Sequence, residues 1–492
     1  MTYIRASEIG CALDCDLESG RNKYGHGKAT DDSPRINAAM AAASVDHPIT
    51  LIIDGSALIS GLFLPAGGYW GIAGLGCGTG FFVKRGTNND GIHNGGPDAA
   101  VPSDPGPPAP PRGRSVSLSN FSLNGNGAKG GDSTTPIRQG DASGAVWYFG
   151  INLMNLNDIT IENVVVANTP AYHFRFSNVG NVSVSGCVTN STALSTDGLH
   201  FDGPANDITI SNCNFTTGDD AIALNGPEGH SGDISRVTVN NCKFDSWSLM
   251  RLDSINCSGC LPTCNISAIS VSNCTGSLRQ AAFLIGQGAN ADPALVTGLR
   301  ISDCNLTAPS IIELAANFGT IELARVTLNA SRARMNPDFA SPGMGFTRTS
   351  PYMYGCTYKG AVLTVNQCVV ERTSKGVTGG FILEYGSSIE RLEINGLSIQ
   401  DEQGKSYPAV PRLVDLAAGS VGTLLLNSVD NKLIEAPCDS GQFSAIGLIA
   451  GKGVLATGWE FPDAVMADGV PYISATTHLP SIKVDGVVEP YP

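Results

Sequence analysis

The sequence predicts an all-β protein, a right-handed parallel β-helix (solenoid) with a short N-terminal capping helix. Glycine contributes 59 of the 492 residues and only 15% of the chain is charged, which favours short strands and tight turns over long solvated helices. A sequence motif that suggests strand, turn and strand also recurs. Most spacings between neighbouring copies fall in the range of about 20 to 50 residues that is typical of repeat architectures.

The repeated line predicts a strand, a polar corner and a second strand. In the copy TISNCNF, Ile208 and Ile210 alternate with polar residues before a Ser-Asn pair, and Cys213 and Phe215 alternate after it. A β-propeller would need a longer and more regular period, and a leucine-rich repeat its own leucine spacing. The other copies are SLSNFSL at 117, TIENVVV at 160, SVSGCVT at 183, TVNNCKF at 238, SVSNCTG at 270, RISDCNL at 300, LTVNQCVV at 363 and LEINGLSI at 392.

Stacking of these coils, about 4.8 Å apart, predicts two columns of side chains. The corner asparagines should form a hydrogen-bonded ladder, and six of the 14 cysteines should stack as small buried hydrophobic residues. The cysteine count therefore does not fix the redox compartment. The six are Cys187, Cys213, Cys242, Cys274, Cys304 and Cys368.

The N-terminal segment TDDSPRINAAMAAASVD predicts the helix that covers the first coil. Ser33 is the expected N-cap and Pro34 the first helical residue. Strands are expected in ITLIIDG and ALISGLFLPAG, which follow. The apolar face of the helix consists of Ile36, Ala39, Met40 and Ala43.

We expect a single domain, 1–492. Residues from about 1 to 60 form the N-terminal cap and first strands, and those from about 113 to 430 the main coils. The proline-rich DAAVPSDPGPPAPPRGR is expected to be a long excursion between coils. Residues from about 431 to 492 either cap the last coils or contact another subunit, which leaves a homo-oligomer open.

Composition argues against two classes of partner. The net charge of −14 and the pI near 4.9 repel nucleic-acid phosphates and anionic lipid, so we expect no nucleic-acid partner. No run of about 20 apolar residues is present, so we expect no membrane partner. The start, MTYIRASEIG, lacks the features of a secretory signal, so a signal was removed or export occurs another way.

Three aspartates fall on consecutive coils. Asp197 lies in TDG, and Asp219 and Asp220 lie in TGDDAIAL about one coil later, which places their carboxylates close together. Like charges that close raise at least one pKa, as a general acid requires, and hydrolysis of a glycosidic bond needs such an acid and a carboxylate that activates water. Each motif alone is an ordinary turn sequence, but the pair on matched coils favours a site.

The motifs TDG, DITISNC and TGDDAIAL resemble the core of family 28 glycoside hydrolases, the polygalacturonase family, over roughly residues 145 to 255. The cap TDDSPRINAAM is similar to that of the wider pectate-lyase-like superfamily, which includes viral tailspike depolymerases. The resemblance implies that Asp219 is the general acid, and that Asp197 and Asp220 hold and deprotonate the attacking water in an inverting displacement.

The chain departs from this family on the next two coils. At the place of the family's GHG motif it has SWSLMRLD, with Trp247 and Ser248, and at the place of the RIK motif, which implies a grip on a uronate carboxylate, it has RQAAFLIG. We therefore expect a substrate other than polygalacturonate.

Residues that alternate outward near the aspartates are candidates to bind a sugar, since sugars bind through charged planar groups and aromatic faces. The alternative for each is an ion-paired surface arginine, a lone exposed loop histidine or a tryptophan packed on the next coil. The candidates are His173 and Arg175 on the coil before, His200 and Asp202 beside Asp197, His230 in the loop GPEGHSG, and Trp247 and Arg251 on the coil after.

The cluster NCSGCLPTCN contains Cys257, Cys260 and Cys264. Zinc needs four ligands, and here three cysteines stand with no histidine nearby, so a local disulfide is the better interpretation. We expect no metal and no other cofactor.

The leading hypothesis is a secreted or extracellular hydrolase, with a virion surface also open, that acts on a polysaccharide or oligosaccharide. Two alternatives remain. One is a polysaccharide lyase of the same fold, in which acids hold calcium and a basic residue removes a proton. The other is a noncatalytic, viral-type glycan-binding β-helix.

Overall fold

The computed structural model describes most of the chain and divides it into two compact units, Met1–Cys264 and Asn265–Pro492. The described residues are 1–25, 27–87, 89–95, 108–127, 148–191, 193, 195–254, 264–286, 295–331, 352–354, 358–373, 381–384, 388–415, 420–430, 432–438, 443–446, 460–461, 463, 466, 471–474 and 476–490.

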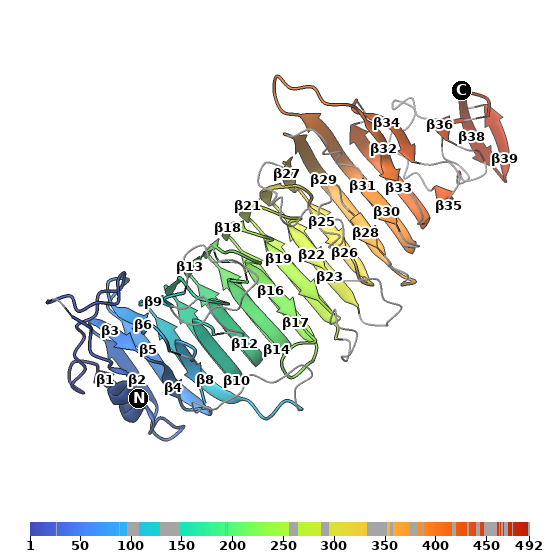
Figure 1. Ribbon diagram of the computed structural model, residues 1–492. Helices are drawn as coiled ribbons and strands as arrows, with labels where there is room; N and C mark the ends of the chain where they lie inside the picture. The colour runs from blue at the N-terminus through green and yellow to red at the C-terminus, as the bar shows by residue number, and fades with distance from the viewer. Residues whose placement is uncertain are drawn as a thin grey trace. The chain divides into compact units, whose positions relative to one another are not determined.

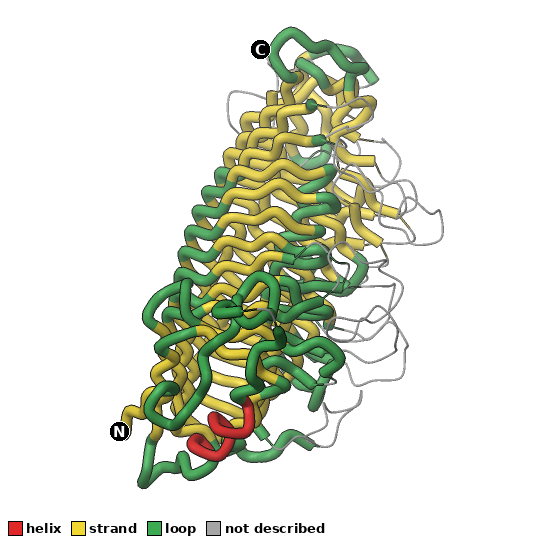
Figure 2. The backbone as a smooth tube through the Cα atoms, turned by 60° about the vertical axis from the view of Figure 1, so that its left-hand side comes forward, coloured by secondary structure: helices red, strands yellow, loops and turns green. Residues whose placement is uncertain are grey.

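The first unit is a stack of coils whose strands form three parallel sheets (Figure 1, Figure 2). Sheet A consists of β1 (Thr2–Arg5), β2 (Ile49–Ile53), β5 (Gly68–Gly74), β8 (Gly113–Ser119), β17 (Ile234–Asn240) and the second halves of β10 (Ile151–Glu162), β12 (Phe174–Ser185) and β14 (Leu199–Ser211). Sheet B consists of β3 (Ser56–Ile59), β6 (Gly80–Val83), β9 (Ser122–Asn124), β11 (Val165–Ala167), β13 (Val188–Asn190), β15 (Asn214–Thr216) and β18 (Lys243–Ser246). Sheet C consists of β4 (Leu62–Leu64), β7 (Ile92–Asn94), the first halves of β10, β12 and β14, β16 (Ile222–Asn225) and β19 (Met250–Asp253).

The interior of this unit is filled by one side chain per coil at each position. Phe176 and Phe201 stack at 4.6 Å between ring centroids, and Phe215 and Phe244 at 5.4 Å. Such aromatic pairs contribute about 0.5–1.5 kcal/mol each beyond burial of area. The predicted cysteine column is also buried, and the Cys213 thiol contacts its neighbours on the adjoining coils.

The turn from sheet A to sheet B, here called the asparagine corner, confirms the predicted ladder. Asn163, Asn212 and Asn241 adopt φ values of 53°, 55° and 54°, a left-handed conformation that asparagine tolerates better than most residues. Asn163 Nδ2 donates to Asn120 Oδ1 at 3.1 Å, and Asn241 Nδ2 to Asn212 Oδ1 at 2.7 Å.

The N-terminal helix α1 (Ser33–Met40) packs beside β4 and buries Ile36 and Met40. The expected N-cap was wrong: the cap residue is Asp32, and its carboxylate accepts hydrogen bonds from the backbone of Ala12 and Leu13. Ser33 lies inside the helix, where its hydroxyl accepts a hydrogen bond from Ser60 N at 2.7 Å. Both polar side chains therefore fasten the helix to neighbouring segments.

The second unit repeats the coil and ends in a small sheet of β36–β39, in which β37, β38 and β39 pair antiparallel. One of its coils, β26 and β27, carries Arg325 and Val326 in place of the Asn-Cys pair and was not among the predicted copies. The predicted all-β fold, a right-handed parallel β-helix, is confirmed. The strands are β20 (Ile266–Ser272), β21 (Thr275–Leu278), β22 (Phe283–Ile285), β23 (Val296–Ser302), β24 (Asn305–Ala308), β25 (Ile312–Leu314), β26 (Thr320–Ala324), β27 (Thr327–Ala330), β28 (Tyr352–Tyr354), β29 (Val362–Arg372), β30 (Phe381–Glu384), β31 (Ser388–Asp401), β32 (Val410–Asp415), β33 (Ser420–Asp430), β34 (Ile434–Cys438), β35 (Phe443–Ile446), β36 (Glu460–Phe461), β37 (Pro471–Ser474), β38 (Pro480–Val484) and β39 (Val487–Pro490).

Two predictions fall largely outside the described residues. Most of the proline-rich excursion lies there, as do Cys257 and Cys260, so the local disulfide stays a prediction. Among the described residues, no helix is long and apolar enough to cross a membrane.

Candidate active site

The three aspartates lie at the turn from sheet B to sheet C of the first unit, here called the aspartate corner. Its residues are 168–173, 195–198, 217–221 and 247–249 on successive coils. Backbone hydrogen bonds stack these turns: Gly198 N donates to Asp220 O at 3.0 Å, and Trp247 N donates to Asp219 O at 2.9 Å. The coil geometry thus brings residues that are 22 and 28 positions apart into contact.

Carboxylate oxygens of Asp197, Asp219 and Asp220 lie within 4.8 Å of one another. Asp197 and Asp220 are buried, whereas Asp219 is partly exposed. The backbone N–H of Asp220 donates to Asp197 Oδ1 at 3.2 Å, which ties the Asp197 side chain to the backbone of the next coil. The expected patch of three acids is therefore present, and its accessible member is Asp219.

Asp220 is held by two donors from the following coil. Ser248 Oγ donates to one carboxylate oxygen, and Arg251 Nε donates to the other at 2.5 Å. Arg251 also lies 3.7 Å from Asp253, on the same strand. Both oxygens of this buried carboxylate therefore accept a hydrogen bond, one from a hydroxyl and one from a guanidinium.

Asp197 has a different basic partner, His200. Its Oδ2 lies 2.7 Å from His200 Nδ1, and the other ring nitrogen lies 3.0 Å from Glu228 Oε2 and 3.0 Å from Asp202 Oδ1. Burial raises the pKa of Asp197 to about 6, and the hydrogen bond from His200 opposes the rise.

Asp219 is the carboxyl group that most favours a proton. Burial, followed by the charges of Asp220 and Asp197, raises the pKa of Asp219 well above its usual range. Among the described residues, no cation forms an ion pair with it. The site therefore contains two carboxylates that contact basic side chains and one carboxyl group whose pKa is raised without such a partner among the described residues.

Two groups of acidic and imidazole atoms are close enough to suggest a metal ion: the three aspartates, and His200 with Asp202 and Glu228. In the second group both His200 nitrogens face carboxylate oxygens, so neither offers a lone pair to a metal. In the first, both oxygens of Asp220 already accept hydrogen bonds. Hydrogen bonds therefore engage both ring nitrogens in the second group and both oxygens of Asp220 in the first.

Residues 118–246 match the family model of glycosyl hydrolases family 28. The matched segment contains all three aspartates, and it confirms the predicted resemblance. A curated relative from Arabidopsis thaliana, named "Probable polygalacturonase", is 24% identical over 179 residues. That match covers 36% of this chain and 37% of the relative, so the chain spans little more than a third of the relative's length.

Among solved structures, the surface adhesin PfbA of Streptococcus pneumoniae is similar with a TM-score of 0.51 at 12% identity, covering 85% of this chain and all of the adhesin. A family 28 exopolygalacturonase of Yersinia enterocolitica has a TM-score of 0.47 at 11% identity, covering 86% of this chain and 78% of that enzyme. At such identities the adhesin supports the fold alone.

The outward-facing candidates on the coil before the aspartates are fully covered. His173 is 0% exposed, its Nδ1 lies 2.8 Å from Asp197 O, and burial lowers its pKa to about 4. Arg175 is 4% exposed, pairs with Asp202, and lies 5.3 Å from the centre of the Phe149 ring. His173 and Arg175 therefore pack next to the aspartate corner on the preceding coil. A direct role of either residue in sugar binding stays a prediction.

His230 and Trp247 also lie mostly inside, at 9% and 6% exposed. The loop that carries His230 folds back over sheet C, where Gly229 sits against Ser177 and Asp202. Because a side chain would overlap those atoms, glycine is required at this close approach. Binding of a sugar by His230 or Trp247 stays a prediction.

Sequence reasoning missed Glu228, Tyr172 and the role of Ser248. Glu228 is the one acid of the loop GPEGHSG, and glycines on both sides of it were the available signal for a folded loop. Tyr172 precedes β12, so alternation along that strand does not predict where it lies. Its ring stacks on His200 with centroids 3.9 Å apart.

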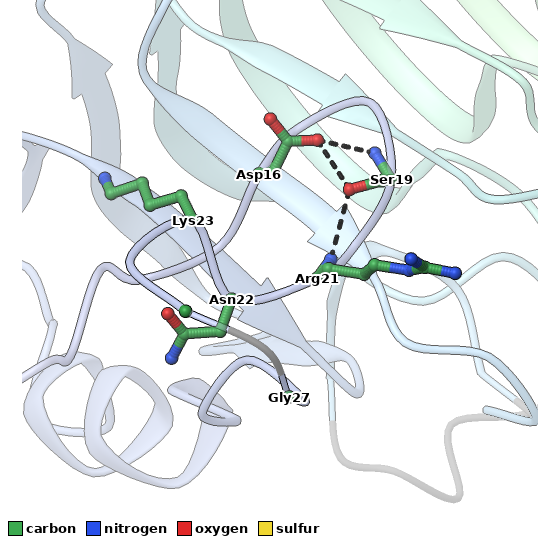
Figure 3. A pocket seen from close by; sticks show the side chains of 7 residues that line it. Asp16, Ser19, Arg21, Asn22, Lys23 and Gly27 are labelled. Carbon is green, nitrogen blue, oxygen red and sulfur yellow. Dashed lines mark hydrogen bonds between the residues drawn. The ribbon is translucent and has the colours of Figure 1, made fainter.

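A separate cavity of about 630 Å³ lies at the N-terminal loop (Figure 3). Arg21 and Lys23 line it together with Asp16, which caps its own turn by accepting hydrogen bonds from Ser19. None of the three aspartates lines this cavity, which belongs to the cap.

Proposed function

We propose that this chain is a glycoside hydrolase that cleaves a glycosidic bond in a polysaccharide or oligosaccharide by inversion. Asp219 protonates the leaving oxygen, and Asp197 and Asp220 hold and deprotonate the attacking water. The proposal implies a secreted or surface-exposed protein, because polysaccharides of this kind lie outside the cell.

The difference between Asp219 and its two neighbours carries this proposal. Asp197 is paired with His200 and Asp220 with Arg251, while Asp219 is partly exposed and has no cationic partner among the described residues. Hydrolysis of a glycosidic bond requires one carboxyl group that keeps its proton and others that remain ionised. Carboxyl groups in different local environments can meet this requirement, because their pKa values differ.

The distance between the carboxylates bears on whether hydrolysis inverts or retains the configuration of the anomeric carbon. Oxygens within 4.8 Å are nearer to the spacing of retaining enzymes, about 5–5.5 Å, than to that of single-base inverting enzymes, about 6.5–9.5 Å. A retaining enzyme needs a carboxylate that is free to attack carbon, however, and both oxygens of Asp220 and of Asp197 accept hydrogen bonds. Proton NMR of the first anomer released distinguishes the two outcomes.

We further propose that the substrate is not polygalacturonate. The three cationic groups of the described site, Arg175, Arg251 and His200, all pair with carboxylates of the protein itself. A uronate carboxylate would have to compete for them with buried partners. A neutral glycan has no carboxylate and needs no free cationic side chain.

The decisive experiment compares the wild type with Asp219→Asn on polygalacturonate and on neutral polysaccharides, by following reducing ends and ultraviolet absorbance. We expect reducing ends from a neutral glycan, and a loss of about 10²- to 10⁴-fold in kcat for the variant, as for removal of a general acid. Asp207→Asn is the matched control, because Asp207 lies on the same coil but pairs at the surface with Arg236.

Other outcomes would point to the alternatives. Absorbance from an unsaturated product would indicate a lyase. Binding of a glycan that is equal in the wild type and Asp219→Asn, without turnover by either, would indicate a noncatalytic binding protein and end the hydrolase proposal.

A further inference from the structure

His200 is enclosed on every side by groups that hold it in one orientation. Its side chain is 1% exposed, and the Tyr172 ring stacks on it with 7° between the planes. Nδ1 meets Asp197 at 2.7 Å and Nε2 meets Glu228 at 3.0 Å, so the ring joins a base of the proposed reaction to an acid on a covering loop.

The partners of the ring decide how many protons it carries. A neutral imidazole has one N–H and one lone pair, and an ionised carboxylate can only accept hydrogen bonds. Here both nitrogens face carboxylate oxygens, so a neutral ring would direct a lone pair at a negative oxygen. With both nitrogens protonated, the ring donates in both directions.

The charges around His200 leave it as the counter-ion of Asp197. Arg175 pairs with Asp202, and Arg251 pairs with Asp220 and lies near Asp253. Neither guanidinium is within ion-pairing distance of Asp197 among the described contacts. The titratable and charged groups that face His200 and Asp197 from the neighbouring elements are Tyr172, His173, Arg175, Asp202, Asp219, Asp220, Glu228, His230, Arg251 and Asp253.

We propose that His200 is a positioning residue: a buried imidazolium, held by Glu228 and Asp202, that orients Asp197 and keeps it ionised as a base. The role of Asp197 as a base rests on the proposed function, whereas the charge on His200 does not. Burial alone would lower the pKa of His200, but the charge of Glu228 and hydrogen bonds with Asp197, Asp202 and Glu228 raise it well above its usual value.

His173 supplies an internal comparison one coil earlier. It is equally buried, but its Nδ1 faces the carbonyl oxygen of Asp197, and no carboxylate among the described residues contacts its ring, so burial lowers its pKa to about 4. The two histidines are therefore expected to differ in charge at neutral pH because their partners differ.

Nuclear magnetic resonance of the ring atoms tests the charge without any substrate. The chain has 7 histidines, so labelled histidine side chains give a tractable spectrum, with His200→Gln and His173→Gln used for assignment. We expect the resonance lost in His200→Gln to keep both nitrogens protonated up to pH 8. The resonance lost in His173→Gln should remain that of a neutral ring down to about pH 5. Titration of the His200 ring near pH 6.5 would overturn the proposal.

Glu228→Gln provides a second variant in case His200→Gln fails to fold, because the Glu228 side chain is 33% exposed. Glu228→Gln keeps a hydrogen-bond acceptor for His200 Nε2 but removes the negative charge. The His200 ring should therefore lose its second proton at a lower pH than in the wild type. An unchanged titration would show that Glu228 does not hold that proton.

Kinetics on the glycan that the wild type hydrolyses test the effect on Asp197. In His200→Gln the acidic limb of the kcat/KM profile should move up by at least about one pH unit, because an adjacent opposite charge lowers a carboxyl pKa by about 1–3. In His173→Gln the limb should stay near pH 6, whatever the loss of stability. An unmoved limb in His200→Gln would refute the positioning role. If no glycan is hydrolysed, the proposed function fails, while the NMR titration still decides the charge.

Discussion

The asparagine corner and the aspartate corner are two turns of the same coil, and they hold polar side chains in opposite ways. At the asparagine corner, amides on adjoining coils pair, as Asn163 does with Asn120 at 3.1 Å and Asn241 does with Asn212 at 2.7 Å. An amide both donates and accepts, so identical residues satisfy one another through the stack. At the aspartate corner, stacked carboxylates repel, and each buried one needs a cation from a neighbouring strand.

This difference explains why one corner repeats and the other does not. The asparagine corner uses this amide pairing at two places among the described residues of the first unit and contributes to stability. The aspartate corner changes from turn to turn, with Asp197, then Asp219 and Asp220, then Ser248. It retains raised pKa values that cost folding free energy but suit acid–base chemistry. The comparison predicts opposite responses to mutation.

The largest expected effect comes from Arg251→Gln, which removes the cation of Asp220. Arg251 and Asp220 side chains are only 15% and 3% exposed, and an uncompensated buried charge costs about 3–5 kcal/mol. We expect a drop of that size in the free energy of unfolding, measured by chemical denaturation, together with loss of turnover.

Arg236→Gln is the matched control. Arg236 Nε lies 2.5 Å from Asp207, the same separation as between Arg251 and Asp220, but the side chains are 58% and 47% exposed. Solvent screens such a pair, so we expect a much smaller loss of stability than in Arg251→Gln. Equal losses in the two variants would mean that burial does not distinguish the corners.

A smaller effect of opposite sign is expected for Asp219→Asn. Because the folded pKa of Asp219 is raised, its favourable contribution is complete below the unfolded pKa, about 3.9, and is lost as pH rises through the folded pKa. The variant should therefore gain stability relative to the wild type between pH 4 and pH 7, by about 1.4 kcal/mol for each pH unit over which the carboxyl holds its proton. Denaturation curves at several pH values measure this.

Asp207→Asn should instead lose stability relative to the wild type at neutral pH. The hydrogen bond from Arg236 lowers the pKa of Asp207 to about 2, so this carboxylate stabilises the fold above the unfolded pKa and the effect disappears as pH falls. A neutral-pH gain in both variants would contradict the contrast between an active-site acid and a surface acid.

The sequence was sufficient for the fold and for the meeting of the aspartates because both depend on the coil repeat. Alternation predicted the inward phenylalanines, and one coil of separation predicted that Asp197 would meet Asp219 and Asp220. The cap residue was missed because Asp32 and Ser33 are both plausible helix caps, and tertiary contacts with Ala12 and Ser60 select between their roles.

The supporting residues could not be predicted in the same way. Glu228 reaches His200 through a loop that folds back over sheet C, and no periodicity determines a loop path. Burial of Arg175 and Trp247 likewise depends on what covers the sheet, which alternation along one strand does not reveal.

The smallest expected effect is at the asparagine corner, where Asn212→Ala should reduce the free energy of unfolding by about 1–2 kcal/mol and leave turnover unchanged. Alanine tolerates a φ of 55° poorly, at a cost of that order, and it also loses the exposed hydrogen bond with Asn241. Asn212→Gly separates the two causes, since glycine accepts the conformation but not the hydrogen bond. We expect glycine to recover most of the loss. If glycine were as destabilising as alanine, the ladder of amides, rather than the left-handed turn, would be what stabilises this corner.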